Sequence, residues 1–202
     1  MTTAMERELV LYGGPNSPYA RMTRVVGTEL SLAFDYRIID VYRAEFLDIF
    51  NPLRQIPTLV VDGRQAIYDS RTIFAFFAMR ADRPDFLHAG DMEATTRAAL
   101  AMGLTDTCFG HRMESIRPDR ERSPDALARL AGKLERGLAH MEGMAGDIAA
   151  GPVRLEQVVA ASMLGYVDYR YGRDWRTYCP GLARWQAGFA ARDSMKQSQP
   201  YG

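Results

Sequence analysis

The sequence predicts an α/β domain followed by an all-helical domain. Strand and helix signals follow one another in the order β-α-β-α-β-β-α over roughly the first 80 residues, and only helical periodicity follows the polar linker at 81–90. With 202 residues, of which 47% are hydrophobic, the chain is long enough to bury two cores. We therefore predict an N-terminal domain over residues 1–81 and an all-helical domain over residues 90–202.

The elements of the first domain follow from apolar runs and from turn and capping residues. An apolar run at 9–12, closed by Gly13 and Gly14, predicts a strand. Ser17 as the N-cap and Pro18 at the first helical position predict a helix that ends near residue 30. The other expected elements are a strand at 34–41, a short helix at 44–50, a hairpin of 58–61 and 65–68 around Asp62 and Gly63, and a helix that begins at Asp69 or Ser70 and ends near Arg80.

The second domain is predicted from helical periodicity alone. A helix from about residue 92 to residue 116 places Leu100, Leu104, Cys108 and His111 on one face. An amphipathic helix is indicated by apolar residues at spacings of three and four, namely Leu127, Leu130, Leu134, Leu138 and Met141. A helix at about 155–169 is apolar nearly all round, which is typical of the centre of a bundle, and a last helix carries Leu182, Trp185 and Phe189.

Charge and cysteine content narrow the class of function. The 25 basic residues balance the 25 acidic ones, which argues against nucleic acid or a membrane as a partner and favours a small molecule. Cys108 and Cys179 are too few for a disulfide framework and the N-terminus is polar, so we expect a cytoplasmic protein. His88, His111 and His140 form no metal-binding pattern, and no metal is expected.

One candidate site lies at 16–19, between the first strand and the first helix. Backbone N–H groups and the helix dipole there attract an anion such as a thiolate, and a hydroxyl at Ser17 can donate to it. The alternative is that Ser17 only caps the helix.

Two further segments can likewise be interpreted either as parts of a binding site or as purely structural features. Pro57 opens a strand and leaves the backbone of Ile56 without a ladder partner, so a peptide-like ligand can pair there unless Pro57 is only a sheet-edge proline. Asp69 and Ser70 open a helix, where they can receive an ammonium and a carboxylate or can serve as caps alone.

The order and spacing of these three segments resemble the cytosolic glutathione S-transferases, whose N-terminal domain is thioredoxin-like. Residues 17–20 look like the active-site turn of that family, with Ser17 in the place of the first cysteine of redox relatives. Residues 51–57, Asn-Pro-Leu-Arg-Gln-Ile-Pro, are similar to its Asn-Pro-x-Gly-Lys-Val-Pro segment. Asp69-Ser70 looks like its Glu/Asp-Ser pair, and residues 180–185 resemble its Pro-x-Leu-x-x-Trp pattern.

The resemblance implies a homodimeric glutathione S-transferase of the bacterial type that acts in detoxification. Ser17 would stabilise the thiolate of glutathione, a co-substrate, for attack on a small hydrophobic electrophile. The glutathione-binding residues would be Ser17, Gln55, Ile56, Pro57, Asp69 and Ser70, and the electrophile pocket would be formed by Tyr19, Leu104, Cys108, His111 and Arg112.

Several alternatives stay open. Tyr12 ends the first strand near the position of the catalytic residue in tyrosine-type members, although the helix dipole favours Ser17. Arg54 and Gln55 stand where Gly and Lys are usual, which leaves room for a non-catalytic glutathione- or ligand-binding protein. A glutathione-dependent thiol reductase or peroxidase is less favoured, because mixed-disulfide chemistry needs cysteine at position 17.

A last departure concerns stability. The family's helix-opening box, Ser/Thr-x-x-Asp, appears here as Arg154-Leu155-Glu156-Gln157, which lacks the hydroxyl cap and the carboxylate. We expect a loss of about 1 kcal/mol unless other contacts compensate.

Overall fold

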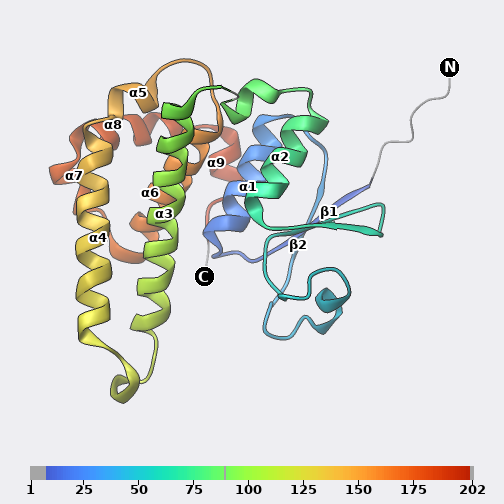
Figure 1. Cartoon of the computed structure of the whole chain (residues 1–202), viewed down its shortest axis with the longest axis horizontal. Coiled ribbons are helices and arrows are strands. Elements are labelled where there is room, and N and C mark those ends of the chain that lie inside the picture. The colour runs from blue at the N-terminus through green and yellow to red at the C-terminus, as the bar shows by residue number, and fades with distance from the viewer. Residues whose placement is uncertain (1–7, 89, 201–202) are drawn as a thin grey trace. The chain divides into compact units, whose positions relative to one another are not determined.

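Figure 1 shows the computed structural model of the chain, which describes residues 8–88 and 90–200. The chain divides into two compact units, and among these residues the first comprises 8–87 with 197–200 and the second comprises 88–196. The first unit mixes strands and helices, whereas the second contains only helices. The predicted fold class is therefore confirmed, with the difference that the last four described residues join the first unit.

The first unit contains a four-stranded mixed sheet in the order β2-β1-β3-β4. Strand β1 is parallel to β2, and β3 is antiparallel to both β1 and β4. This is the thioredoxin-like arrangement. Its elements are β1 (Leu9–Gly13), α1 (Pro18–Glu29), β2 (Asp35–Ile38), η1 (Glu45–Ile49), β3 (Thr58–Val61), β4 (Gln65–Ile67), α2 (Ser70–Arg80) and η2 (Pro84–Leu87).

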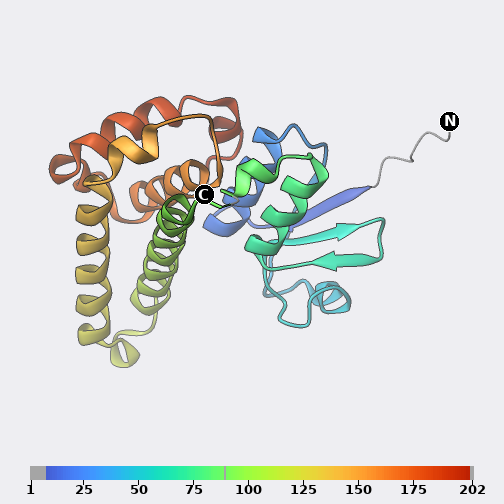
Figure 2. The same ribbon diagram turned by 45° about the horizontal axis from the view of Figure 1, so that its top comes forward.

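The two faces of this sheet are covered differently (Figure 2). Helices α1 and α2 lie on one face and the η1 segment lies on the other. Val10, Tyr12 and Val60 point to the η1 face, where they pack with Leu47. Because strand side chains alternate, Leu11 and its register partner on β3 point to the helical face, and both are fully buried. Each such side chain stabilises the unit by about 1.5–3 kcal/mol.

The second unit is built around an antiparallel pair, α3 and α4, that Figure 1 shows side by side. Helix α6 packs along α3 and is buried on nearly all sides. Among the described residues no helix is long and apolar enough to cross a membrane. The elements are α3 (Met92–Ser115), η3 (Asp119–Glu121), α4 (Pro124–Glu142), α5 (Ala145–Ala149), α6 (Leu155–Tyr171), α7 (Trp175–Tyr178), α8 (Pro180–Phe189) and α9 (Asp193–Gln197).

A glycine sets the closest approach of α3 and α4. A Cβ atom at Gly137 would lie 2.2 Å from Cδ2 of Leu104, which is itself buried. A larger residue at this point of α4 would therefore have to displace the buried Leu104 side chain.

The start of α6 replaces the missing hydroxyl cap with other partners. The side chain of Gln157 accepts a hydrogen bond from Arg154 N at 2.6 Å. The backbone N–H of Glu156 donates to Nε2 of His88 at 2.9 Å, and the Glu156 carboxylate accepts from Arg97 Nε at 2.6 Å. These contacts replace the missing hydroxyl cap and carboxylate, and two of the partners, His88 and Arg97, come from distant parts of the chain.

The C-terminal residues return to α1 within the first unit. Arg24 Nη2 donates to the carbonyl of Gln197, and Arg21 Nε lies 3.5 Å from the hydroxyl of Ser198. These contacts explain why 197–200 belong to the first unit and not to the second.

Candidate functional site

The turn between β1 and α1 holds Ser17 in an N-cap conformation. Its φ and ψ are −77° and 119°, and its hydroxyl oxygen accepts from Ala20 N at 3.2 Å. The Ser17 hydroxyl makes no other hydrogen bond with the described residues, so its proton is available to a ligand. The side chain is partly exposed at the positive end of the α1 dipole, where an anionic acceptor is stabilised.

Tyr36, which the sequence analysis did not single out, fixes this turn. Its hydroxyl donates to the carbonyl of Gly14 at 3.2 Å, and the guanidinium of Arg24 lies 4.3 Å from the centre of its ring. A Cβ atom at Gly13 would lie 2.7 Å from the Tyr36 ring and 2.9 Å from Ala20 Cβ. Tyr36 and Ala20 therefore hold the backbone that presents Ser17.

The segment before β3 presents the backbone of Ile56. The Ile56–Pro57 peptide bond is cis, and neither N–H nor C=O of Ile56 forms a hydrogen bond with any described residue. Asn51 is 1% exposed and holds the segment in place, because its Nδ2 donates to the Gln55 carbonyl at 3.2 Å and to the Thr58 hydroxyl at 2.9 Å. A free donor and acceptor on one fixed residue can pair with a peptide-like ligand.

Arg54 shows why the similar family segment carries glycine at this position. Its φ is 46°, in the left-handed region that glycine adopts without a steric cost. Its guanidinium forms an exposed ion pair with Asp48, and hydrogen bonding to Arg54 lowers the pKa of that carboxyl.

We expect the variant Arg54→Gly to be more stable than Arg54→Ala by about 1 kcal/mol, reversing the usual order of these two residues in a helix. Both variants lack the ion pair with Asp48, so the difference between their free energies of unfolding reports the cost of the left-handed backbone conformation. Urea unfolding followed by circular dichroism measures it. Equal stability of the two variants would contradict the left-handed conformation at this position.

The segment after β4 offers a second helix N-terminus. The Asp69 carboxylate accepts from Arg71 N at 3.0 Å and from Thr72 N at 3.4 Å, which caps α2. The hydroxyl and backbone N–H of Ser70 make no hydrogen bond with the described residues, so they remain available to an anion. Asp69 is exposed and can also meet a cation.

The sheet register brings the three segments to one edge. Tyr12 pairs with Thr58, so two residues further along the same register Gly14 lies opposite Ile56. The position of the Ile56 side chain agrees with this register, because its Cδ1 atom lies 3.0 Å from the place that a Cβ atom at Gly14 would occupy. In the same way the pairing of Leu59 with Ile67 places Pro57 opposite Asp69. The turn at Ser17, the backbone of Ile56 and the start of α2 therefore border one site.

Tyr12 lies elsewhere, on the η1 face of the sheet. Its ring packs edge-on against Phe46 at 5.3 Å between centres and stacks with Phe50 at 6.4 Å. The side chain is 9% exposed and belongs to the apolar cluster of that face. This packing gives the aromatic ring at the end of β1 a structural role.

The residues predicted to meet the electrophile have different environments. Leu104 and Cys108 are buried in the helical unit, and burial raises the pKa of the Cys108 thiol to about 12. Tyr19, His111 and Arg112 are partly exposed in their own units. Burial lowers the pKa of His111, whose ring lies edge-on to Tyr171. A contact of these residues with an electrophile stays a prediction.

The groups that the Ser17 edge offers to a ligand are a hydroxyl at Ser17, a second hydroxyl at Ser70, the Asp69 carboxylate and the free backbone of Ile56. No group of three or more His, Cys, Asp or Glu side chains within residues 8–88 and 90–200 is arranged to hold a metal ion.

Comparison with known proteins gives consistent findings for both halves of the chain. Residues 16–80 match the family model "Glutathione S-transferase, N-terminal domain". An uncharacterized GST-like protein, YibF, of Escherichia coli K12 is 26% identical over 94% of this chain and 98% of its own length. The crystal structure of a glutathione S-transferase from Methylobacillus flagellatus with glutathione bound is similar with a TM-score of 0.89 and 29% identity, covering 96% of this chain and 100% of that one. A glutathione S-transferase from Methylobacterium radiotolerans in complex with glutathione sulfonate is similar with a TM-score of 0.88 and 28% identity, covering 96% of each chain.

Proposed function

Because this chain belongs to the glutathione S-transferase family, we propose that it binds reduced glutathione at the Ser17 edge of the sheet and transfers it to a small hydrophobic electrophile. The observation that carries the proposal is the convergence of a free hydroxyl proton, a free backbone pair and a free helix N-terminus at one edge. The solved relatives from Methylobacillus flagellatus and Methylobacterium radiotolerans hold glutathione or its sulfonate.

Each part of glutathione has a matching group in this arrangement. The backbone of Ile56 would pair with the cysteinyl unit across the cis bond to Pro57. Ser70 and the α2 N-terminus would receive the γ-glutamyl carboxylate, and Asp69 would meet the ammonium. Gln55 is exposed and would offer its amide to the glycyl carboxylate, a weaker contact than the lysine usual in the family.

The reaction then depends on stabilising the thiolate. The thiol of glutathione has a cysteine-like pKa of about 8.5, so little of it is ionised at neutral pH. Lowering that pKa by two units takes about 2.7 kcal/mol. A hydrogen bond from Ser17 to the charged sulfur contributes about 1.5–3 kcal/mol and the α1 dipole about 0.3–1 kcal/mol. The thiolate attacks the electrophilic carbon, a C–S bond forms, the leaving group departs with its electron pair and the thiol proton passes to solvent.

The test removes the hydroxyl and follows the bound thiol. Ser17→Ala is expected to abolish the ultraviolet thiolate absorbance of bound glutathione near neutral pH and to lower the rate of transfer about 100- to 1000-fold. Calorimetry should show glutathione binding within a fewfold of the parent chain, because the backbone of Ile56 and the α2 N-terminus are untouched.

Matched controls separate catalysis from helix capping. Ser123 caps α4 with the same geometry, its hydroxyl accepting from Ala126 N at 3.2 Å, so Ser123→Ala carries the capping cost alone. Tyr12→Phe tests the tyrosine alternative. Binding of glutathione without thiolate absorbance in the parent chain would favour a non-catalytic glutathione-binding protein, and absence of binding at millimolar glutathione would overturn the proposal.

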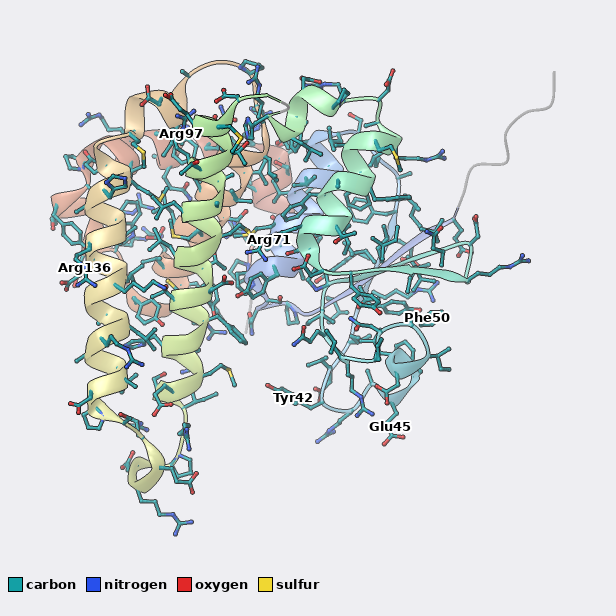
Figure 3. The ribbon with its side chains drawn as sticks, in the orientation of Figure 1. Tyr42, Glu45, Phe50, Arg71, Arg97 and Arg136 are labelled. Carbon is teal, nitrogen blue, oxygen red and sulfur yellow. The ribbon has the colours of Figure 1, made fainter. Side chains whose placement is uncertain are left out.

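We also propose a homodimer in the cytoplasm. Several large apolar side chains are exposed on the segment between β2 and β3, with Tyr42 80%, Ile49 82% and Leu53 63% exposed. Figure 3 shows Tyr42 extending away from this segment. Burying such side chains against a second copy is favourable. Sedimentation equilibrium of the full chain tests the proposed homodimer, and a monomer at micromolar concentration would count against it.

A further inference from the structure

A cavity lies in the helical unit; of the five residues predicted to meet the electrophile, His111 lines it and the other four do not. It has a volume of about 150 Å³ and is bordered by α3, α4, α6 and α7. Its walls are mainly apolar, with Leu130, Ala131, Leu134 and Leu138 on α4 and Val167 on α6. An apolar volume of this size accepts one aromatic ring. All lining residues come from the helical unit, so the cavity is complete without the first unit.

One part of the cavity wall is aromatic and fixed in place. Trp175 is 3% exposed, and its Nε1 donates to the carboxylate of Asp168 at 2.8 Å. Tyr171 donates from its hydroxyl to the carbonyl of Cys108 at 2.7 Å. The rings of Trp175 and Tyr171 therefore present preorganised surfaces to a ligand.

The polar residues that line the cavity carry negative charge. Glu135 on α4 and Asp174 before α7 are exposed, and neither carboxylate has an ion-pair or hydrogen-bond partner in the part of the chain that is described. Both carboxylates act on Tyr178, another lining residue: burial raises the pKa of its hydroxyl, and these charges raise it further. The two carboxylates and the phenol ring thus form one acidic, aromatic rim.

No positive charge in the described wall opposes this rim. Lysine and arginine are absent from the residues that line the cavity. Arg176 lies 5.1 Å above the Trp175 ring, but its charge is balanced by Asp168, with Nη2 and Oδ2 2.6 Å apart. His111 also lines the cavity, and burial lowers its pKa, which keeps it neutral at pH 7.

We propose that this cavity binds a small arylalkylammonium ion. The aromatic ring of the ligand occupies the apolar volume between α4 and α6, and its ammonium group lies between Glu135 and Asp174 beside the Tyr178 ring. Coulombic attraction and a cation–π contact select the cation over neutral and anionic ligands of the same shape. The binding is non-covalent and independent of glutathione.

Three ligands of nearly equal size test the proposal: phenethylamine, phenethyl alcohol and phenylacetate. The probe is the fluorescence of Trp175 in the full chain carrying Trp185→Phe, because Trp185 packs against Phe189 and does not line the cavity. We expect phenethylamine to bind roughly tenfold more tightly than phenylacetate at low salt, with the alcohol between them. Calorimetry on the parent chain should give the same order.

Two kinds of variant separate the effect of the negative charge on ligand binding from the effect of the cavity volume. Glu135→Gln combined with Asp174→Asn should remove the preference for the amine, while Asp125→Asn, an exposed acid of α4 outside the cavity, should leave it. Ala131→Phe should fill the cavity and abolish binding of all three ligands. The proposal is overturned if phenylacetate binds as well as phenethylamine, or if none of the three changes the signal of Trp175 at millimolar concentration. Circular dichroism serves as the measure of folding throughout, and failure of glutathione binding in the parent chain bears only on the proposed transferase.

Discussion

Replacing Arg97 with methionine is expected to lower the free energy of unfolding of the helical unit by about 3–5 kcal/mol. The variant leaves the Glu156 carboxylate buried without its counter-charge. In the structure Arg97 Nε and Glu156 Oε2 are 2.6 Å apart, and the two side chains are only 14% and 6% exposed. Arg97 extends from the beginning of α3 (Figure 3) and so connects that helix to the first turn of α6. The cost falls toward the lower end of the range because the α6 dipole favours a carboxylate at this position.

Urea unfolding followed by tryptophan fluorescence measures this loss, since Trp175 and Trp185 both lie in the helical unit. Arg120→Met is the control: Arg120 pairs with Glu121 at 3.6 Å but is 87% exposed, so its loss should cost less than about 1 kcal/mol. The double variant Arg97→Met with Glu156→Gln should recover part of the stability, because no charge is then left buried. An Arg97 effect no larger than the Arg120 effect would show that the pair is solvated.

His88→Ala is expected to cost about 2–3 kcal/mol at pH 7.5 and to flatten the acid side of the stability curve. Nε2 of His88 accepts from the Glu156 backbone N–H, so the native ring is neutral and its proton is on Nδ1. His88 is 3% exposed, and burial lowers its pKa. Around it the carboxylates of Asp91 and Glu156 oppose the guanidinium groups of Arg97 and Arg154.

The sign of the pH dependence follows from this shift. The folded pKa of His88 lies below the unfolded value of about 6.5, so the unfolded chain binds a proton first as the pH falls. The contribution of His88 to stability is complete above about pH 6.5 and declines as the pH falls toward the folded pKa, with a slope of up to about 1.4 kcal/mol per pH unit.

Urea midpoints measured between pH 5 and pH 8 test this second prediction. The slope of the unfolding free energy against pH counts the protons taken up on unfolding, and His88→Ala should reduce it by most of one proton. The contribution of His111 should remain, because burial lowers the pKa of His111 too. His140→Ala is the control, since His140 is exposed in the last turn of α4. A slope in the His88 variant equal to that of the parent chain would contradict a neutral, hydrogen-bonded ring at the start of α6.

The sequence predicts those parts of the fold that depend on interactions between residues close to one another in the chain. Ser17 with Pro18, the Asp62–Gly63 turn and Asp69 act on atoms within a few positions, and each begins or ends an element where expected. The second strand shows the limit of such signals: an alternating pattern suggested 34–41, but the ladder with β1 covers only Asp35–Ile38 before the backbone turns toward η1.

The remaining features depend on contacts between distant residues. His88 and Glu156 are 68 positions apart, and Tyr36 reaches Gly14 across 22 positions. Local signals at Arg154–Gln157 indicate only a missing hydroxyl cap and a missing carboxylate, because His88 and Arg97, which supply two of the replacing contacts, belong to other parts of the chain. At the site, local signals indicate three ordinary caps and turns, and the register of β1, β3 and β4 brings these segments to one edge of the sheet.

The return of residues 197–200 to α1 has a consequence for the order in which the protein is made. A ribosome releases the sheet and its two helices long before it releases Gln197 and Ser198, whose carbonyl and hydroxyl face the guanidinium groups of Arg24 and Arg21. The unit that is synthesised first is thus completed last. Newly made chains that stop short of these residues would carry every segment of the proposed glutathione site and still lack a piece of their first unit.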